Sequence, residues 1–210
     1  MTRRAAPSRR HLQAAAIDCF ARHGYQGASI DRIAREAGVT KGAVYCHFRD
    51  KEELLFEAVR DRVSSFEHKV LETVADRDPA ATLRGAAEAC FFFATVSNHR
   101  RFIITLMVEA LDTNPRLSAE FQNMLRRMRA FLTAAIRLGQ QQGAFRRDVE
   151  PDTAAAAFVA GIMGAEIQHY QDPEQAPLRD ILDLHVEQTI AWLGARGDKV
   201  DAATGGIAAW

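Results

Sequence analysis

The sequence lacks any apolar run close to the ~20 residues that a membrane-spanning helix needs. Its basic beginning, MTRRAAPSRR, is not followed by the apolar core of a secretory signal. There are only three cysteines, Cys19, Cys46 and Cys90, and no two of them have CxxC spacing. This argues against a disulfide framework and against a structural zinc site. We therefore expect a cytoplasmic protein with no membrane partner.

The common catalytic motifs are also missing. The sequence contains no HExxH, no paired Glu-x-x-His, no GxSxG and no Walker loop, and its seven histidines are scattered. We therefore expect no catalytic residue, no metal ligand and no cofactor, and we expect that the protein is not an enzyme. No convincing strand pattern and no internal repeat is present, which favours an all-α fold.

Lysine and arginine balance aspartate and glutamate over the whole chain, but not within its parts. Residues 1–51 carry ten basic and four acidic residues, a net charge of +6, and residues 52–210 carry −6. A basic first quarter suggests an N-terminal module that faces a polyanion. The alternative is a chance imbalance between two solvated surfaces.

Two short helical patterns lie between residues 30 and 51, in IDRIAREAGVTKGAVYCHFRDK. Gly38 suits the left-handed position that ends the first helix, and Thr40 suits the N-cap of the second. A short connector with a glycine between two helices is the helix-turn-helix signature. Apolar residues recur at helical spacing in both patterns: Ile30, Ile33, Ala34 and Ala37 in the first, Val44 and Phe48 in the second.

If Val44 and Phe48 face inward, four neighbouring residues of the same segment face outward or lie at the rim. A cation, a small residue and polar aromatic side chains then gather on one surface, which fits a phosphate-lined groove. These residues are Lys41, Gly42, Tyr45 and His47.

Helices are also expected on both sides of this motif. A helix over residues 9–23 should end at Gly24, with a loop over residues 24–27 and Ser29 as the next N-cap. Asp50 and Glu53 resemble a capping box that opens a long helix reaching about residue 75. That helix is longer than a small head requires, so it should join the head to the rest of the protein.

Residues 10–70 resemble the DNA-binding domain of the TetR family of bacterial transcriptional regulators, and most closely its AcrR-like branch. The ordered block AGVTKGAVYCHFRDKEELLF carries most of the resemblance. Cys46 departs from the pattern, because family members often have an aromatic or polar residue there. The other matching residues come before the block: Ala16, Phe20, Gly24, Tyr25, Ser29, Ile33 and Ala34.

The resemblance implies a DNA-binding surface. Its members would be Thr40, Lys41, Gly42, Tyr45, His47 and Lys51, with Ser29 and Arg10 beside them. Lys51 would hold a phosphate at the start of its helix. Gly42 has the alternative of simply allowing close approach of the backbone, and His47 that of packing or capping. Cys46 is a candidate for a redox role, although a lone thiol is more often inert.

The remaining chain has helical periodicity over residues 79–96, 99–111, 116–142, 153–170 and 177–194, which makes about nine helices in all. We expect a DNA-binding domain over residues 10–70, a ligand-binding and dimerisation domain over 71–195, and a flexible tail over 196–210. In the family such a bundle encloses an effector pocket. The candidate pocket residues are Phe91, Phe92, Phe102, Met107, Phe121, Met124 and Met128, with a filled core as the alternative.

Small and apolar residues occupy several faces of the helices over 153–170 and 177–194, which favours a homodimer through these helices. The alternative is that these faces close the core of one subunit. The resemblance then implies a ligand-responsive regulator, most often a repressor, released from a palindromic double-stranded DNA operator by a small apolar or amphipathic effector. A ligand-independent DNA-binding protein or a transcriptional activator is the alternative.

Overall fold

The computed structural model describes residues 8–73, 78–96 and 98–194, and within them it contains nine α-helices and no strand. The first four are α1 (Arg9–Gly27), α2 (Ile30–Glu36), α3 (Lys41–Tyr45) and α4 (Lys51–Thr73). The other five are α5 (Pro79–Val96), α6 (His99–Thr113), α7 (Pro115–Gln141), α8 (Pro151–Gln171) and α9 (Leu178–Gly194). The all-α prediction is confirmed, and the predicted tail over 196–210 lies outside the described residues.

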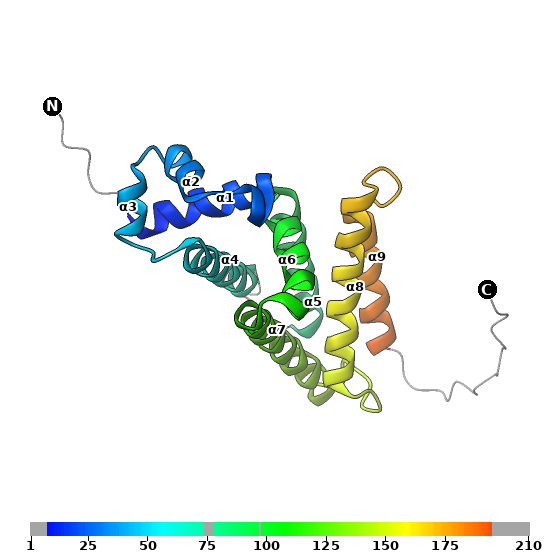
Figure 1. The fold of residues 1–210 in the computed structure, drawn as a ribbon. Coiled ribbons are helices and arrows are strands. Elements are labelled where there is room, and N and C mark those ends of the chain that lie inside the picture. The colour runs from blue at the N-terminus through cyan, green and yellow to red at the C-terminus, as the bar shows by residue number, and fades with distance from the viewer. Residues whose placement is uncertain (1–7, 74–77, 97, 195–210) are drawn as a thin grey trace.

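The helices form a head at one end and a bundle at the other (Figure 1). Helices α1, α2 and α3 make the head, and α8 and α9 lie side by side at the far end of the bundle. Helices α4 and α6 both pack against α1 and lead from the head into the bundle. None of the helices in the described ranges combines the length and the apolar character that a membrane crossing requires.

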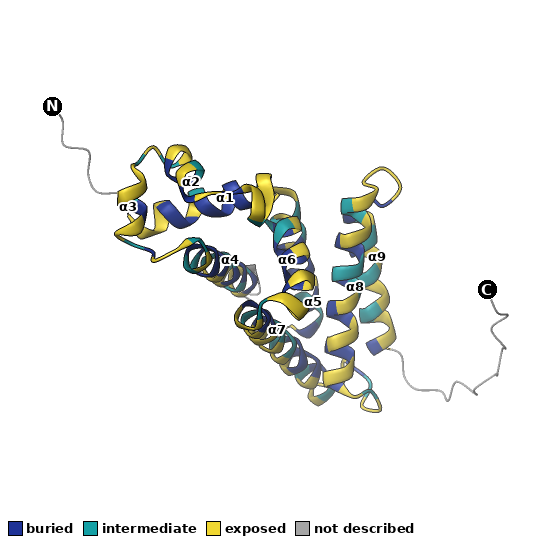
Figure 2. Cartoon of the chain, viewed as in Figure 1, coloured by how far each residue is buried: buried dark blue, intermediate teal, exposed yellow. Residues whose placement is uncertain are grey.

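Helix α4 contributes to two separate apolar clusters, and the buried faces that form them point inward (Figure 2). Its first half, through Val63, packs with the head helices and with the inner faces of α6 and α7. Its second half, with Phe66 and Val70, packs with α5, α7, α8 and α9. The expectation that α4 joins the two parts of the protein is therefore confirmed.

The predicted loop after Gly24 is wrong. Gly24 has a φ of 69°, which breaks the helix where expected, but the chain then makes one further helical turn to Gly27. Gly38 has a φ of 66° and ends α2 as predicted. A glycine can therefore kink a helix without ending it when the following residues resume helical hydrogen bonding.

A buried ion pair connects α6 to α8. Arg100 donates two hydrogen bonds, of 2.8 and 2.9 Å, to the two carboxylate oxygens of Glu166, and both side chains are almost fully buried. Burial opposes the charged guanidinium, but Glu166 more than offsets this and raises the pKa of Arg100. The guanidinium also lies 5.0 Å from the ring centre of Phe66, so this pair links α4, α6 and α8.

Candidate DNA-binding interface and effector site

Helix α3 presents an exposed polar surface because its apolar residues anchor it from behind. Val44 and Phe48 are buried in the head core, as predicted. Thr40 caps the helix, its hydroxyl oxygen accepting from the Ala43 N–H at 3.2 Å. Lys41, Gly42 and Tyr45 are then exposed, with 48% of Tyr45 accessible, and His47 is half-buried beside them.

An exposed ion pair connects α2 to α3. Lys41 Nζ lies 2.9 Å from Asp31 Oδ2, and Ser29 caps α2 by accepting from the Arg32 N–H at 3.2 Å. The hydrogen bond to Asp31 raises the pKa of Lys41, so this side chain stays cationic. An exposed pair of this kind is weak, and a phosphate can replace Asp31 at little cost.

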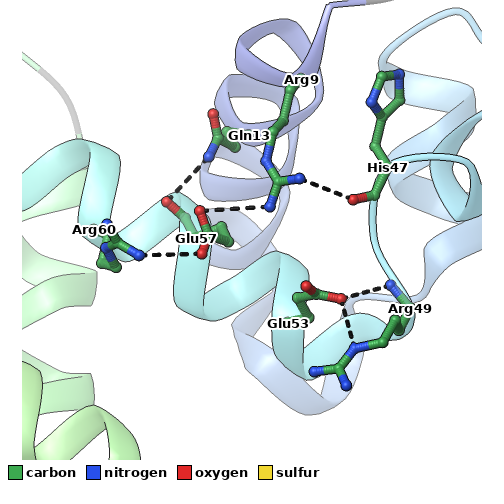
Figure 3. Close-up of polar contacts among 7 residues, drawn as sticks. All are labelled: Arg9, Gln13, His47, Arg49, Glu53, Glu57 and Arg60. Atoms are coloured by element: carbon green, nitrogen blue, oxygen red, sulfur yellow. Dashed lines mark hydrogen bonds and ion pairs between the residues drawn. The ribbon is translucent and has the colours of Figure 1, made fainter.

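The first turn of α1 lies beside the end of α3, and polar contacts between α1 and α4 hold it there (Figure 3). Arg9 donates to the carbonyl oxygen of His47 at 3.2 Å and lies 3.6 Å from Glu57. Gln13 donates to the Glu57 carbonyl at 3.4 Å. Arg10, the residue after Arg9 in α1, is exposed.

The N-terminus of α4 is capped by two carboxylates. Asp50 accepts from the Glu53 N–H at 2.8 Å, while Glu53 accepts from both the backbone N–H and the side chain of Arg49. In a capping box, Glu53 would accept from the backbone N–H of the cap residue Asp50, whereas here it accepts from Arg49, one residue earlier. These bonds from Arg49, the backbone one foremost, lower the pKa of Glu53.

Lys51 is already engaged within the head. Its Nζ donates to the carbonyl oxygens of Tyr25 and Ala28 at 3.0 and 3.2 Å, and it lies 4.0 Å from the centre of the Tyr25 ring. No local pattern around Lys51 indicates these partners, because they lie more than twenty residues earlier, in the turn after Gly24. Its role in binding a phosphate remains a prediction.

The seven candidate pocket residues do not gather around one cavity in the described structure. Phe102, Met107, Phe121 and Met124 belong to the first apolar cluster, whereas Phe91 and Met128 pack against the second. Phe92 is 42% exposed. The spacing of residues along each helix could not predict which cluster each residue joins. That depends on how the helices pack, and α4 contributes its first half to one cluster and its second half to the other.

Three hollows of the bundle differ in size and lining. Met124 borders a void of about 20 Å³ next to Arg100, and Met128 borders an apolar groove of about 180 Å³ between α4 and α7. Phe66 lines both. A larger open cleft of about 440 Å³ lies between α5 and α9, flanked by the Arg84–Glu187 and Arg179–Glu88 ion pairs.

Comparison with protein families matches both parts of the chain. Residues 12–58 match a family described as "Bacterial regulatory proteins, tetR family", and residues 102–181 match "Tetracyclin repressor-like, C-terminal domain". The chain belongs to the TetR family of bacterial transcriptional regulators. TetR-family members are DNA-binding regulators and not enzymes, as the sequence predicted, while placement in the AcrR-like branch remains a prediction.

Relatives and solved structures of the TetR family cover most of the chain. The HTH-type transcriptional repressor DhaR of Mycobacterium sp. (strain GP1) is 24% identical over 86% of this chain and 91% of its own length. A TetR transcriptional regulator from Chloroflexus aurantiacus has a TM-score of 0.77 at 22% identity, covering 85% of this chain and 92% of that one. The regulator FadR of Bacillus subtilis in complex with stearoyl-CoA has a TM-score of 0.75 at 17% identity, with coverage of 88% and 99%.

Proposed function

We propose that this TetR-family protein is an effector-responsive repressor whose homodimer binds a palindromic operator through the surface around α3. The exposed set of Thr40, Lys41, Gly42 and Tyr45, held in place by the buried Val44 and Phe48, is the observation that carries the proposal. One head reads too few base pairs for useful specificity, and two-fold symmetry brings a second head to the next half-site.

The proposal divides the chain into a DNA-binding domain over residues 10–70 and a ligand-binding and dimerisation domain over 71–195. Helix α4 crosses the boundary and packs in both clusters, so a movement of its second half would reach the head. An effector that changes the separation of the two heads would weaken operator binding. The loss of binding free energy equals the difference between the effector's affinity for the DNA-free and the DNA-bound protein, about 1–3 kcal/mol.

DNA recognition is tested with a duplex selected from a random library by the wild-type protein. Tyr45→Ala should lower affinity for that duplex about 5- to 150-fold, because a side chain in the interface contributes roughly 1–3 kcal/mol to binding. Arg84→Gln, in the distant α5, is the matched control and should bind like wild type. Equal affinity of the Tyr45 variant and wild type would remove α3 from the interface.

Lys51 requires a different variant, because its ammonium also bonds inside the head. Lys51→Met retains the aliphatic stem and removes the charge. If Lys51 holds a phosphate, the variant lowers DNA affinity and the steepness of its salt dependence. A lower melting temperature with unchanged salt dependence would assign Lys51 to the stability of the head alone.

The dimer is proposed to form through α8 and α9, near residues 153–170 and 177–194. Large apolar side chains are exposed on these helices, among them Ile167, Leu184 and Trp192. Leu184→Glu should give monomers in light scattering coupled to size exclusion, whereas Leu111→Glu, at a similarly exposed site of α6, should leave the dimer intact. Monomers from both variants, or from neither, would contradict this interface.

The effector is proposed to be a small apolar or amphipathic molecule. Structures of FadR with stearoyl-CoA and of the repressor SmeT with triclosan support this, since both ligands have that character. In this chain, the apolar groove between α4 and α7, beside Phe66 and Met128, is the proposed place for such a molecule. Native mass spectrometry of the purified protein, followed by addition of the recovered molecule to the protein–DNA complex, tests whether it releases DNA.

A ligand-independent DNA-binding protein is the second candidate, and close packing around the Phe and Met residues favours it. The void at Met124 is only about 20 Å³, close to the space of a single water molecule. If purified protein carries no small molecule and a chemically diverse ligand set leaves both melting temperature and DNA binding unchanged, this second function replaces the first.

A further inference from the structure

Three side chains with metal-binding chemistry meet where α1 faces the end of α2. Cys19 and His23 lie four residues apart on α1, so both project from one face of the helix. Glu36, the last residue of α2, faces them. One donor atom from each of the three residues lies within 4.8 Å of the other two.

A sulfur, an imidazole nitrogen and a carboxylate oxygen form a donor set that suits Zn²⁺. The usual zinc–ligand lengths place neighbouring donors of a tetrahedral site roughly 3.3–3.6 Å apart. His23 Nε2 and Glu36 Oε1 are already 3.5 Å apart. The other two separations are at most 4.8 Å, so they need to close by no more than about 1.2 Å to reach the same geometry, which side-chain rotation can supply.

Solvent reaches two of the three side chains, so a water can supply the fourth ligand. Cys19 is buried, but the side chains of His23 and Glu36 are 35% and 23% exposed, so the three-residue site opens to solvent on one side. Arg22 donates to Glu36 Oε2 at 2.6 Å, which leaves Oε1 directed at His23. A hydrogen bond to the non-coordinating oxygen is how outer residues orient a carboxylate ligand at metal sites.

We propose that Cys19, His23 and Glu36 bind one Zn²⁺ ion that connects α1 to α2 in the head. The Cys19 thiol releases its proton to solvent, and the thiolate sulfur, His23 Nε2, Glu36 Oε1 and one water coordinate the ion with no change in oxidation state. Because α2 packs against α3, the ion restrains the helix that presents Tyr45. This site does not depend on the identity of the effector or of the operator.

The charges around the thiol set how readily it loses its proton. Burial raises the pKa of Cys19 and Glu36 raises it further, whereas Arg22 and Arg32 lower it. A bound cation lowers the pKa of a coordinating thiol far more strongly, so the ion itself drives deprotonation. The expectation of no metal ligand rested on the absence of CxxC, HExxH and paired Glu-x-x-His motifs, and such local motifs cannot reveal a site whose third ligand comes from another helix.

The test uses full-length protein freed of metal with a chelator. Zn²⁺ titrated against a chromophoric chelator should bind one ion per subunit and raise the melting temperature. Co²⁺ in place of Zn²⁺ should give a thiolate-to-cobalt charge-transfer band. No binding at one ion per subunit, or cobalt binding without that band, would overturn the proposal.

His23→Ala is the decisive variant, because His23 is exposed and its removal leaves the core intact. It should lower Zn²⁺ affinity at least about 100-fold, since even outer-shell partners are worth 10–100-fold. Cys19→Ser should abolish the cobalt–thiolate band; if that variant fails to fold, His23→Ala decides alone. Unchanged zinc affinity in His23→Ala overturns the site.

Two control variants separate this site from ordinary surface binding. His68→Ala removes a histidine that also has a glutamate partner, Glu72, at 3.1 Å, but no thiol in its pair. Cys46→Ser removes the exposed cysteine of the same head. Both should bind one ion like wild type, and failure of either to bind would assign the ion to the substituted residue instead.

Discussion

The head and the bundle both cap helices with polar side chains, as Asn114 does at the start of α7, but the bundle also buries a charged pair. In the head, side chains such as Ser29, Thr40 and Asp50 bond to backbone N–H groups at the starts of helices. In the bundle, a charged pair of residues distant in sequence, Arg100 and Glu166, is buried between long helices. A helix of five residues such as α3 has little stability of its own, so its shape depends on its cap and on the core beneath it.

The buried pair of the bundle should show the largest effect of a single substitution. Glu166→Gln leaves the Arg100 guanidinium buried without a counter-charge and should lower the free energy of unfolding by about 3–5 kcal/mol. Urea denaturation measures this. Glu187→Gln is the matched control, because its two bonds to Arg84 are as short but exposed to solvent, and it should destabilise the protein far less. Equal destabilisation in the two variants would remove the distinction between buried and surface pairs.

Two glycines of α8 test how closely the bundle helices pack. A Cβ at Gly161 would overlap the ring of His185 on α9, whereas a Cβ at Gly164 meets nothing within 4 Å. Gly161→Ala should therefore cost about 1–3 kcal/mol in thermal or urea unfolding. Gly164→Ala should stay within about 1 kcal/mol of wild type in the same experiment. A reversed order would mean that α8 and α9 are placed differently.

The caps of the head should have smaller effects. Thr40→Ala removes the acceptor for the Ala43 N–H and should cost about 1 kcal/mol of stability. Thr40→Ser retains the hydroxyl and should recover most of that stability. If the serine variant is as unstable as the alanine variant, the methyl group of Thr40 matters more than its hydroxyl.

The pH dependence of the head should show the smallest effect. The pKa of Glu53 is lower in the folded protein, so its contribution to stability is present above its unfolded pKa and is lost as pH falls through the folded value. Urea denaturation at a series of acidic pH values should show a shallower decline of stability for Glu53→Gln than for wild type, because the amide has no such proton to take up. An identical pH profile for the two proteins would contradict the capping role.

The sequence predicted the head in detail because its signals are local. Gly38, Ser29 and Thr40 determine where helices end and begin within a few residues of themselves, and the structure has them in those roles. The partners of Lys51 could not be predicted in this way. They are backbone carbonyls presented by a turn that continues past Gly24, and only the folded head brings that turn to the start of α4.

The bundle was predicted only as far as helical periodicity allows. Periodicity identified the helices over 79–96 and 116–142, but it cannot tell which cluster a buried Phe or Met joins. Phe102 and Phe91 each lie on a helix with an apolar stripe, yet they pack against different clusters, and α4 contributes side chains to both clusters. Periodicity also could not predict the Arg100–Glu166 pair, because its members are 66 residues apart in the sequence.

The salt dependence of DNA binding tests the central claim, that α3 faces DNA, most directly. Lys41→Gln, measured on the selected duplex over a series of salt concentrations, should lower the slope of log affinity against log salt by about 1, because one lysine no longer neutralises a phosphate. Arg84→Gln, in α5, should leave the slope unchanged. A slope and an affinity that stay at wild-type values in the Lys41 variant would contradict the claim.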